Sequence, residues 1–294
     1  MGNTFLTGGR YDMERSSSTE RFQPLTSISS GDGLEVTPDL YCLTIQIVNV
    51  VFYGHAGESN DWVLIDAGMP KSADAIREAA EDRFGKNNPP KAIILTHGHF
   101  DHIGGLIDLL EVWHVPVYAH PLEIPYLTGR KDYPKPDMSV EGGMVAKLSF
   151  IFPHEGIDLG HNVHPLANDH MVPFMPEWKW IHTPGHTEGH ISLFRANDHA
   201  MIVGDAFVTV RQDALYKVIT QEKEVSGPPR YLTTDWENSE QSVEILQALD
   251  PHVAITGHGQ PAEGRWLKEK LTELAANFRK TAVPDYGKFV EDDH

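Results

Sequence analysis

The chain has 294 residues, 40% of them hydrophobic, which is enough to bury a sizeable core in one large domain or two small ones. It carries 24 Lys and Arg against 42 Asp and Glu, a formal net charge of −18, and it has no basic run that could follow a phosphate backbone, so we expect no nucleic-acid partner. Its single cysteine, Cys42, excludes an internal disulfide framework and a thiolate metal site, and no stretch is apolar enough to span a bilayer, so we expect a protein of the reducing cytoplasm without a membrane partner.

The sequence predicts a polar leader followed by one domain. Residues 1–35 are rich in Ser and Gly and lack a continuous apolar segment, which predicts a flexible or surface-draped leader. Residues 36–294 are then expected to form a single domain. Within it, residues 128–176 lack clear periodicity, and a segment of this length is more often functional than a simple connection. We therefore predict a lid or substrate-facing insertion there.

Extended and helical patterns follow one another along the domain. Apolar runs rich in β-branched residues predict strands at 41–54, 61–68, 91–95, 115–120, 178–182, 191–195, 200–204 and 253–257. Apolar residues at helical spacing predict helices at 72–85, 102–113, 238–249 and 264–280. The first two strands are separated by a turn-like segment and are expected to form a hairpin or meander. The first helix has Ser72 at its start and Gly85 at its end.

Four of the predicted strands lead into side chains that can bind a metal ion. The candidate ligands are His97, His99, Asp101 and His102 in THGHFDH, then His186, Asp205 and His258. Sites commonly form where strand ends and loops converge at one edge of a sheet, so we expect these side chains to meet. The repetition carries the prediction, because any one instance is also compatible with a solvated polar loop in a chain with 17 histidines.

The chemistry of these side chains favours a pair of divalent ions. Imidazole and carboxylate suit zinc, with manganese, iron or cobalt as alternatives. His97 and His99 lie two residues apart at a strand end and are predicted to share one ion, whereas Asp101 and His102 lie past the bend and are predicted to serve a second. Seven groups are too many for one tetrahedral ion, but they suit two ions about 3.5–4 Å apart with a shared carboxylate. Such a pair activates water as a hydroxide nucleophile and polarises a carbonyl group, which predicts a hydrolase.

The motifs together resemble the metallo-β-lactamase-fold hydrolase superfamily. The resemblance rests on HGHFDH, TPGHTEGH, GDAF and TGHG and covers most of the chain. It implies an α/β fold, a four-layer αβ/βα sandwich in which two mixed sheets pack face to face with helices outside. It also implies a first ion held by His97, His99 and His186, and a second held by Asp101, His102 and His258. Asp205 would bridge the two ions, and Asp101 and Asp205 are the expected catalytic carboxylates. The leaving group is expected to be stabilised by one of the ions or to be protonated by Asp101 or by a water.

Four further residues have expected supporting roles. His190 is expected to support a ligand rather than to bind metal, and Asp66 either orients a ligand histidine or caps a turn. Phe207 and Tyr216 are candidates for the substrate pocket. We assign the remaining histidines considered to the surface or to packing: His120, His154, His161, His164, His170, His182, His199 and His252. Trp178 and Trp180 are assigned to sheet packing.

The resemblance narrows the substrate to a small molecule with a carbonyl group. Chain length and the complete ligand set favour a lactone or ester, as in acyl-homoserine lactonases, although Val208 lies where many of those enzymes have tyrosine. The alternatives are a thioesterase of the glyoxalase II type, a β-lactamase-like amide hydrolase and a phosphodiesterase. Only 30 residues follow Gly264, which argues against the helical C-terminal region of glyoxalase II. A non-enzymatic or di-iron redox function is disfavoured, because the sequence shows neither a glutamate among the candidate ligands nor a flavin domain. A homodimer is compatible with the sequence.

Overall fold

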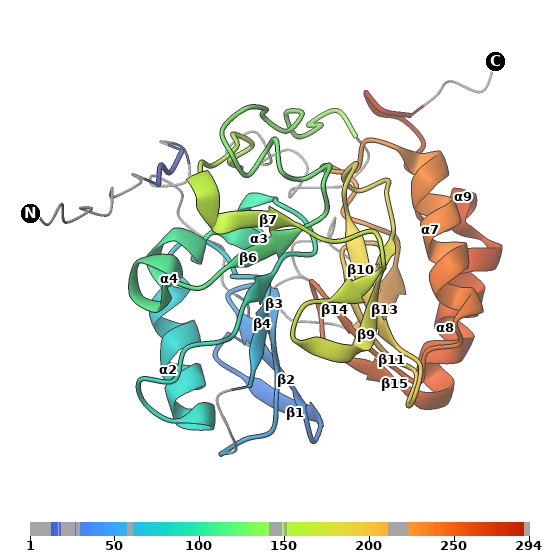
Figure 1. Ribbon diagram of the computed structural model, residues 1–294. Helices are drawn as coiled ribbons and strands as arrows, with labels where there is room; N and C mark the ends of the chain where they lie inside the picture. Colours follow the sequence, from blue (N-terminus) through green and yellow to red (C-terminus); the bar gives the residue numbers. More distant parts are fainter. Residues whose placement is uncertain are drawn as a thin grey trace, which may run out of the picture.

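The fold is a sandwich of two β-sheets between two layers of helices (Figure 1). The computed structural model describes residues 13–16, 18, 27, 30–57, 61–140, 149, 152–210 and 223–290. Two sheets face each other in the centre, and a helical layer covers the outer face of each (Figure 1). The predicted αβ/βα architecture is therefore confirmed.

The first sheet has the order β1-β2-β3-β4-β5-β6-β7 among the described residues. Its strands are β1 (Gly33–Thr37), β2 (Leu40–Ile45), β3 (Val48–Tyr53), β4 (Val63–Ile65), β5 (Ile93–Ile94), β6 (Val117–Ala119) and β7 (Val163–Pro165). Neighbouring strands are antiparallel from β1 to β4 and parallel from β4 to β7, so the sheet is mixed. Its outer face packs on α2 (Ala73–Phe84) and α4 (Leu106–Trp113).

The second sheet has the order β15-β14-β11-β10-β9-β8 among the described residues. Its strands are β8 (Met171–Val172), β9 (Met175–His182), β10 (Ile191–Arg195), β11 (Ala200–Gly204), β14 (Val253–Thr256) and β15 (Ala262–Glu263). Its outer face packs on α7 (Trp236–Ala248), α8 (Gly264–Ala276) and α9 (Phe278–Thr281). Two further strands, β12 (Val208–Val210) and β13 (Lys223–Ser226), pair with each other.

Alternation along the strands explains the layers. Phe52 of β3 contributes to the apolar layer under α2 and α4, while its neighbour Val51 contributes to the layer between the sheets. Successive side chains of a strand point to opposite faces, so a continuous apolar run serves both layers. Trp178 and Trp180 alternate with polar residues and both lie in the layer between the sheets, which confirms their assignment to sheet packing.

Two predicted elements are divided by turns that periodicity does not reveal. The run at 41–54 contains both β2 and β3, because the chain reverses at Gln46, which has a φ of 61°. The helix predicted at 102–113 is two helices, α3 (Phe100–Ile103) and α4. A Cβ on Gly104 would lie 2.1 Å from the Pro70 backbone nitrogen, so the close approach of the 67–70 turn requires glycine at the break.

The segment 128–176 is more regular than the sequence indicated. It contains the 3-10 helix η2 (Gly160–Asn162) and the strands β7 and β8, which are edge strands of the two sheets. Residues 141–148, 150 and 151 lie outside the described part of the chain. The boundary predicted at residue 35 falls inside β1, and Glu14 of the predicted leader exchanges backbone hydrogen bonds with Asp158 at 3.0 and 3.1 Å.

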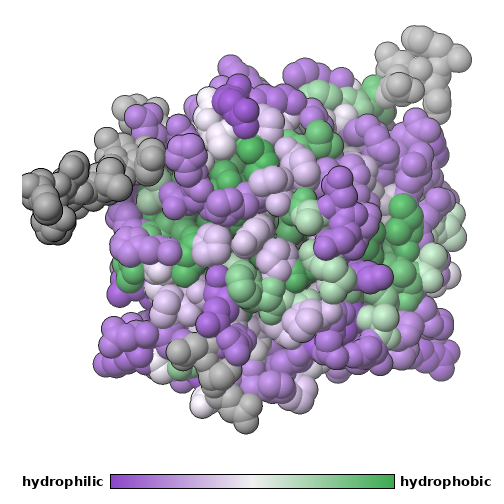
Figure 2. Space-filling view, viewed as in Figure 1, coloured by the Kyte–Doolittle hydropathy of each residue, from purple (hydrophilic) through white to green (hydrophobic). Residues whose placement is uncertain are grey.

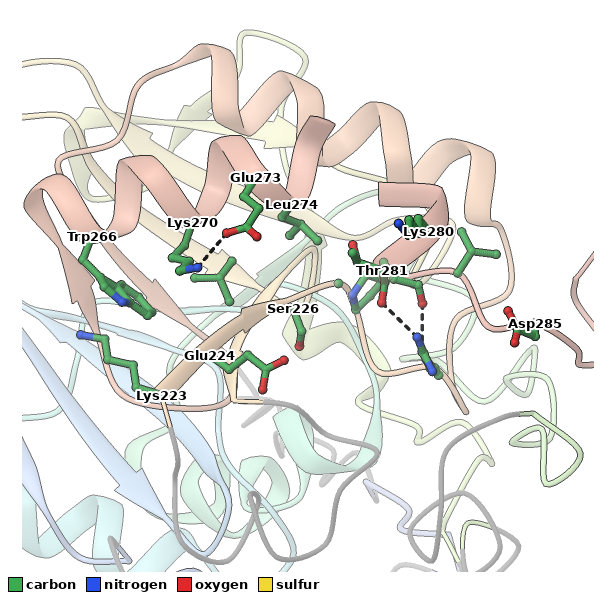
Figure 3. A pocket seen from close by; sticks show the side chains of 16 residues that line it. Lys223, Glu224, Ser226, Trp266, Lys270, Glu273, Leu274, Lys280, Thr281 and Asp285 are labelled. Atoms are coloured by element: carbon green, nitrogen blue, oxygen red, sulfur yellow. Dashed lines mark hydrogen bonds and ion pairs between the residues drawn. The ribbon is translucent and has the colours of Figure 1, made fainter. Parts of the chain in front are cut away.

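A cavity lies beside the helices that cover the second sheet. The face in Figure 2 is mostly hydrophilic, with apolar residues in separate groups. A cavity of 680 Å³ lies between β13, α8 and α9, where Lys223 sits over the Trp266 ring and Lys270 pairs with Glu273 at 2.7 Å (Figure 3). Within the described residues, no helix combines the length and apolar character needed to cross a bilayer.

Candidate metal centre

Loops and turns that follow strands carry all seven candidate ligands. The segment THGHFDH joins β5 to α3, with His97 and His99 in the loop and Asp101 and His102 in the single turn of α3. His186 lies in the loop from β9 to β10, and Asp205 and His258 follow β11 and β14. The ligands therefore follow one strand of the first sheet, β5, and three strands of the second sheet, β9, β11 and β14. These strands end at the same edge of the sandwich.

The structure brings these seven side chains together in a buried cluster. Each is at most 5% exposed. Three overlapping groups each place one ligand atom per residue within 4.8 Å of the others: His97, His99 and His186; His97, His102 and Asp205; Asp101, His102 and His258. His99 Nδ1 lies 2.9 Å from His186 Nε2, and His258 Nε2 lies 3.3 Å from Asp101 Oδ2. The first and third groups contain the two ligand sets that the resemblance implies.

Asp205 lies between the first group, which contains His186, and the third group, which contains Asp101 and His258. Its Oδ1 is 3.5 Å from His102 Nε2, and its Oδ2 is 3.5 Å from His186 Nε2 and 3.3 Å from His258 Nε2. One carboxylate therefore faces imidazoles of both groups, which is the placement a bridging ligand requires.

Four buried polar atoms in this cluster have no hydrogen-bond partner among the described residues. They are His97 Nε2, Asp101 Oδ1, His102 Nε2 and Asp205 Oδ1. Buried polar atoms are almost always hydrogen-bonded, so four such atoms in one cluster require an explanation. Lone pairs of imidazole and carboxylate are the donors that a divalent cation binds, and the residues present therefore fit a metal site.

The electrostatics of the cluster also favour a cation. Burial lowers the pKa of His97 and His186 well below the ordinary value and that of His99 to about 4, so these rings are neutral at pH 7. Burial alone would also lower the pKa of His258, but the Asp205 and Asp101 carboxylates raise it to about 10. Positive charge is thus stabilised beside Asp101 and Asp205, where a divalent ion would provide it.

Nδ1 of four rings is hydrogen-bonded on the side away from the other ligands, so that Nε2 of each ring faces the cluster. His102 Nδ1 donates to Asp66 Oδ2 and His258 Nδ1 donates to the Ile47 carbonyl, both at 2.8 Å. The Thr96 hydroxyl donates to Asp66 Oδ2 at 2.8 Å and so accepts from His97 Nδ1 at 3.1 Å.

The fourth ring follows the same pattern. The Thr233 hydroxyl donates to the Pro229 carbonyl at 2.8 Å and so accepts from His186 Nδ1 at 3.1 Å. Each of these bonds fixes the tautomer in which Nε2 carries the lone pair.

His190 and Asp66 both support the cluster from outside. His190 Nε2 accepts from the Asp205 backbone N–H at 2.8 Å, and its Nδ1 donates to the Thr183 hydroxyl at 2.8 Å, so neither nitrogen is available to a metal. Asp66 holds His102 and also accepts from the Thr96 backbone N–H at 2.8 Å. Of the two roles that the sequence left open for Asp66, the structure shows the orientation of a histidine.

Several supporting residues were not identified from the sequence. They are Thr96, Glu123, Tyr133 and Thr233. Thr96 is the first letter of THGHFDH and was within reach of motif analysis, whereas Thr233 lies 47 positions after the His186 that it contacts. No local pattern marks Glu123, which lies in a turn after β6 and accepts hydrogen bonds from two of the loops that carry ligands.

Of the two substrate-pocket candidates, the structure describes only Phe207. Phe207 is fully buried in the apolar layer that packs against α7 and α8, which corrects its assignment to a pocket. Tyr216 lies outside the described residues. None of the seven candidate ligands is among the described residues that line the 680 Å³ cavity.

Comparisons with known proteins agree on one family. A family model described as the metallo-beta-lactamase superfamily matches residues 43–258. The probable metallo-hydrolase YflN of Bacillus subtilis is 48% identical over 257 residues, which cover 87% of this chain and 97% of that protein. The probable metallo-hydrolase YybB of the same organism is 31% identical, covering 69% of this chain and 78% of that protein. The crystal structure of the B3 metallo-beta-lactamase BLEG-1 superposes with a TM-score of 0.54 at 21% identity, covering 81% and 97% of the two chains.

Proposed function

Because the chain belongs to the metallo-β-lactamase superfamily and is a metallo-hydrolase, we propose that its buried cluster binds two divalent ions, with zinc as the preferred metal. With these ions bound, the protein would hydrolyse a lactone or ester. The observation that carries the proposal is the set of four unpartnered buried ligand atoms. They are distributed over the first and third groups and Asp205, so one ion would leave part of the set unsatisfied.

The protein's own residues would hold the ions, and one of them would transfer a proton. His97, His99 and His186 would hold one ion, Asp101, His102 and His258 the other, and Asp205 both. When bound, the ions supply an activated water as nucleophile and positive charge for the carbonyl oxygen.

Asp101 is the residue best placed to move a proton. Its Oδ1 has no hydrogen-bond partner, while Oδ2 faces His258. Burial alone would raise the pKa of this carboxyl, but His102 and His258 hold it below the ordinary value, so Asp101 is ionised at pH 7. It could then accept a proton from the attacking water and donate that proton to the leaving group.

Aromatic side chains beside the cluster support an apolar group on the substrate. Phe152 of the predicted insertion stacks on Phe100, the residue before Asp101, at 5.5 Å between ring centres. On its other side Phe152 contacts Tyr231 at 5.5 Å, two residues before the Thr233 that holds His186. A row of three aromatic rings thus runs from one ligand segment toward another. Phe100 and Tyr231 are buried, so the partly buried Phe152 is the ring of the three that an acyl chain could contact. The net charge of −18 disfavours a polyanionic substrate.

Metal analysis and a hydrolysis screen test the proposal. Zinc- and manganese-loaded protein would be assayed on acyl lactones, aryl esters, S-lactoylglutathione, a cephalosporin and a bis-phosphodiester. We expect about two ions per chain and highest activity on an acyl lactone or ester. Asp101→Ala should abolish that activity, while Asp74→Ala, which alters a fully exposed aspartate on α2, should not. Fewer than about one ion per chain, or full activity in Asp101→Ala, would refute the assigned site.

A further inference from the structure

Glu123 is a fully buried carboxylate whose two oxygens each accept two hydrogen bonds. Oε2 accepts from the Gly98 backbone N–H at 2.9 Å and from the Tyr133 hydroxyl. Oε1 accepts from the Thr187 hydroxyl at 2.7 Å and from the Gly189 backbone N–H at 3.0 Å. Burial of the side chain raises its pKa, and the four donors oppose that shift by stabilising the charged form.

The four donors belong to the two loops that carry the first ligand group and to one aromatic residue between them. Gly98 separates His97 from His99, and Thr187 and Gly189 lie one and three residues after His186. The Tyr133 ring packs edge-on against the His99 ring at 4.6 Å. Glu123 therefore connects the two loops through its two oxygens. The loops are distant in sequence, since His99 and His186 are 87 positions apart.

Close packing around Glu123 explains two glycines of the ligand motifs. A Cβ on Gly189 would lie 2.8 Å from Glu123 Cγ, and a Cβ on Gly98 would lie 2.4 Å from the Tyr133 hydroxyl oxygen. Contacts this short are not found for real Cβ atoms, so a side chain at either position would separate the loop from the carboxylate. The glycines of HGH and TEGH thus allow both loops to reach one acceptor.

We propose that Glu123 is a positioning residue that sets the spacing of His97, His99 and His186, and thereby the affinity of that group for its ion. The inference rests on the metal site of the proposed function, but it concerns a residue that neither binds metal nor touches substrate. The second group has separate supports, Asp66 and the Ile47 carbonyl, so loss of the Glu123 connection should weaken one ion more than the other.

Glu123→Gln is the sharpest variant because it preserves shape and removes one acceptor. A glutamine has one carbonyl oxygen and one NH₂ group. In either orientation the NH₂ faces a backbone N–H, of Gly98 or of Gly189, and a backbone N–H cannot become an acceptor. The variant therefore releases one of the two loops. Glu188→Gln is the matched control, because Glu188 lies in the same loop but its side chain is 56% exposed and pairs with Lys131.

The experiment uses Co²⁺ as the probe, with its affinity measured by chelator competition and its visible absorption recorded. We expect Glu123→Gln to bind one Co²⁺ about 10–100-fold more weakly and with an altered absorption spectrum, and Glu188→Gln to match the wild type. Hydrogen exchange in the metal-free proteins should be faster at residues 97–99 or 186–190 in Glu123→Gln only. Wild-type affinity and spectrum in folded Glu123→Gln, or unchanged exchange in both loops, would overturn the proposal.

Two milder variants test the positioning role of Glu123 if Glu123→Gln does not fold. Tyr133→Phe and Thr187→Val each remove a single donor and should each weaken Co²⁺ binding, less than the loss of the carboxylate would. Wild-type Co²⁺ affinity in both would overturn the proposal. None of these readouts uses a substrate, so a failed hydrolysis screen would refute the substrate assignment and not the role of Glu123. Should the wild type bind no Co²⁺, the proposed function fails, and the exchange comparison still decides whether Glu123 holds the loops.

Discussion

Replacing Asp66 with Asn should weaken metal binding through the tautomer of His102. Asp66 Oδ2 accepts from His102 Nδ1 and from the Thr96 hydroxyl, and Oδ1 accepts from the Thr96 backbone N–H, all at 2.8 Å. An Asn NH₂ at the Oδ2 position would require a lone pair on His102 Nδ1, which moves the ring proton to Nε2, the atom that faces Asp205. An NH₂ at the Oδ1 position would instead oppose the buried Thr96 N–H.

The expected loss is about 10–100-fold in metal affinity, or roughly 1.4–2.8 kcal/mol. The backbone should not add to it, because Asp66 has a φ of 60° and Asn tolerates this left-handed region as Asp does. The substitution also conserves side-chain volume in a site that is 3% exposed, so no cavity is created. The loss therefore reports the hydrogen bonds of Asp66 to His102 and Thr96 rather than a general loosening of the fold.

Competition with a chromophoric chelator measures this loss directly. Asp74→Asn is the matched control, since the Asp74 side chain is 97% exposed on α2 and should leave the affinity unchanged. The reasoning is refuted if Asp66→Asn retains the wild-type affinity, or if Asp74→Asn loses as much. Thermal unfolding of both metal-free variants would show whether each remains folded.

Three further outcomes are expected. Asp39→Asn should destabilise the fold by about 1–3 kcal/mol at pH 7, because the Arg195 guanidinium loses one of its two carboxylate partners and keeps only Asp198. Burial alone would raise the pKa of Asp39, but Arg195 holds it below its ordinary value. The contribution of the Asp39–Arg195 pair to the free energy of unfolding is therefore present above about pH 4 and disappears as the pH falls through the lower pKa of folded Asp39. Urea unfolding should therefore show a smaller stability difference between Asp39→Asn and the wild type in acid than at pH 7. Burial raises the pKa of the Cys42 thiol to about 12, so a thiol reagent should label it only on unfolding, and rapid labelling of the native protein would contradict its burial. Phe152→Ala should raise KM for long acyl chains more than for acetyl esters, with kcat little changed; an equal effect across a chain-length series would exclude Phe152 from the acyl site.

Local patterns in the sequence predicted the strands β2 to β6, β9 to β11 and β14, the main helices and the list of ligand-type residues, but not β1, β7, β8, β12, β13 or β15. Strand and helix positions followed from periodicity, because burial of one or both faces dictates which residues are apolar. The resemblance carried by THGHFDH and the three later motifs predicted the sandwich. Local patterns did not reveal the reversal at Gln46 or the break at Gly104, because each depends on what packs against the chain there.

Only the tertiary structure decided how the ligand residues are held. Asp66 and Thr233 act on histidines 36 and 47 positions away, and Glu123 joins loops from both sides of the sandwich. Such pairings depend on distances between atoms that folding brings together, and one sequence contains no periodic or spacing signal for them. Residue type therefore indicated which side chains can bind a metal, whereas the fold decides which nitrogen each ring presents and how far apart the rings lie, because those depend on hydrogen bonds from distant segments.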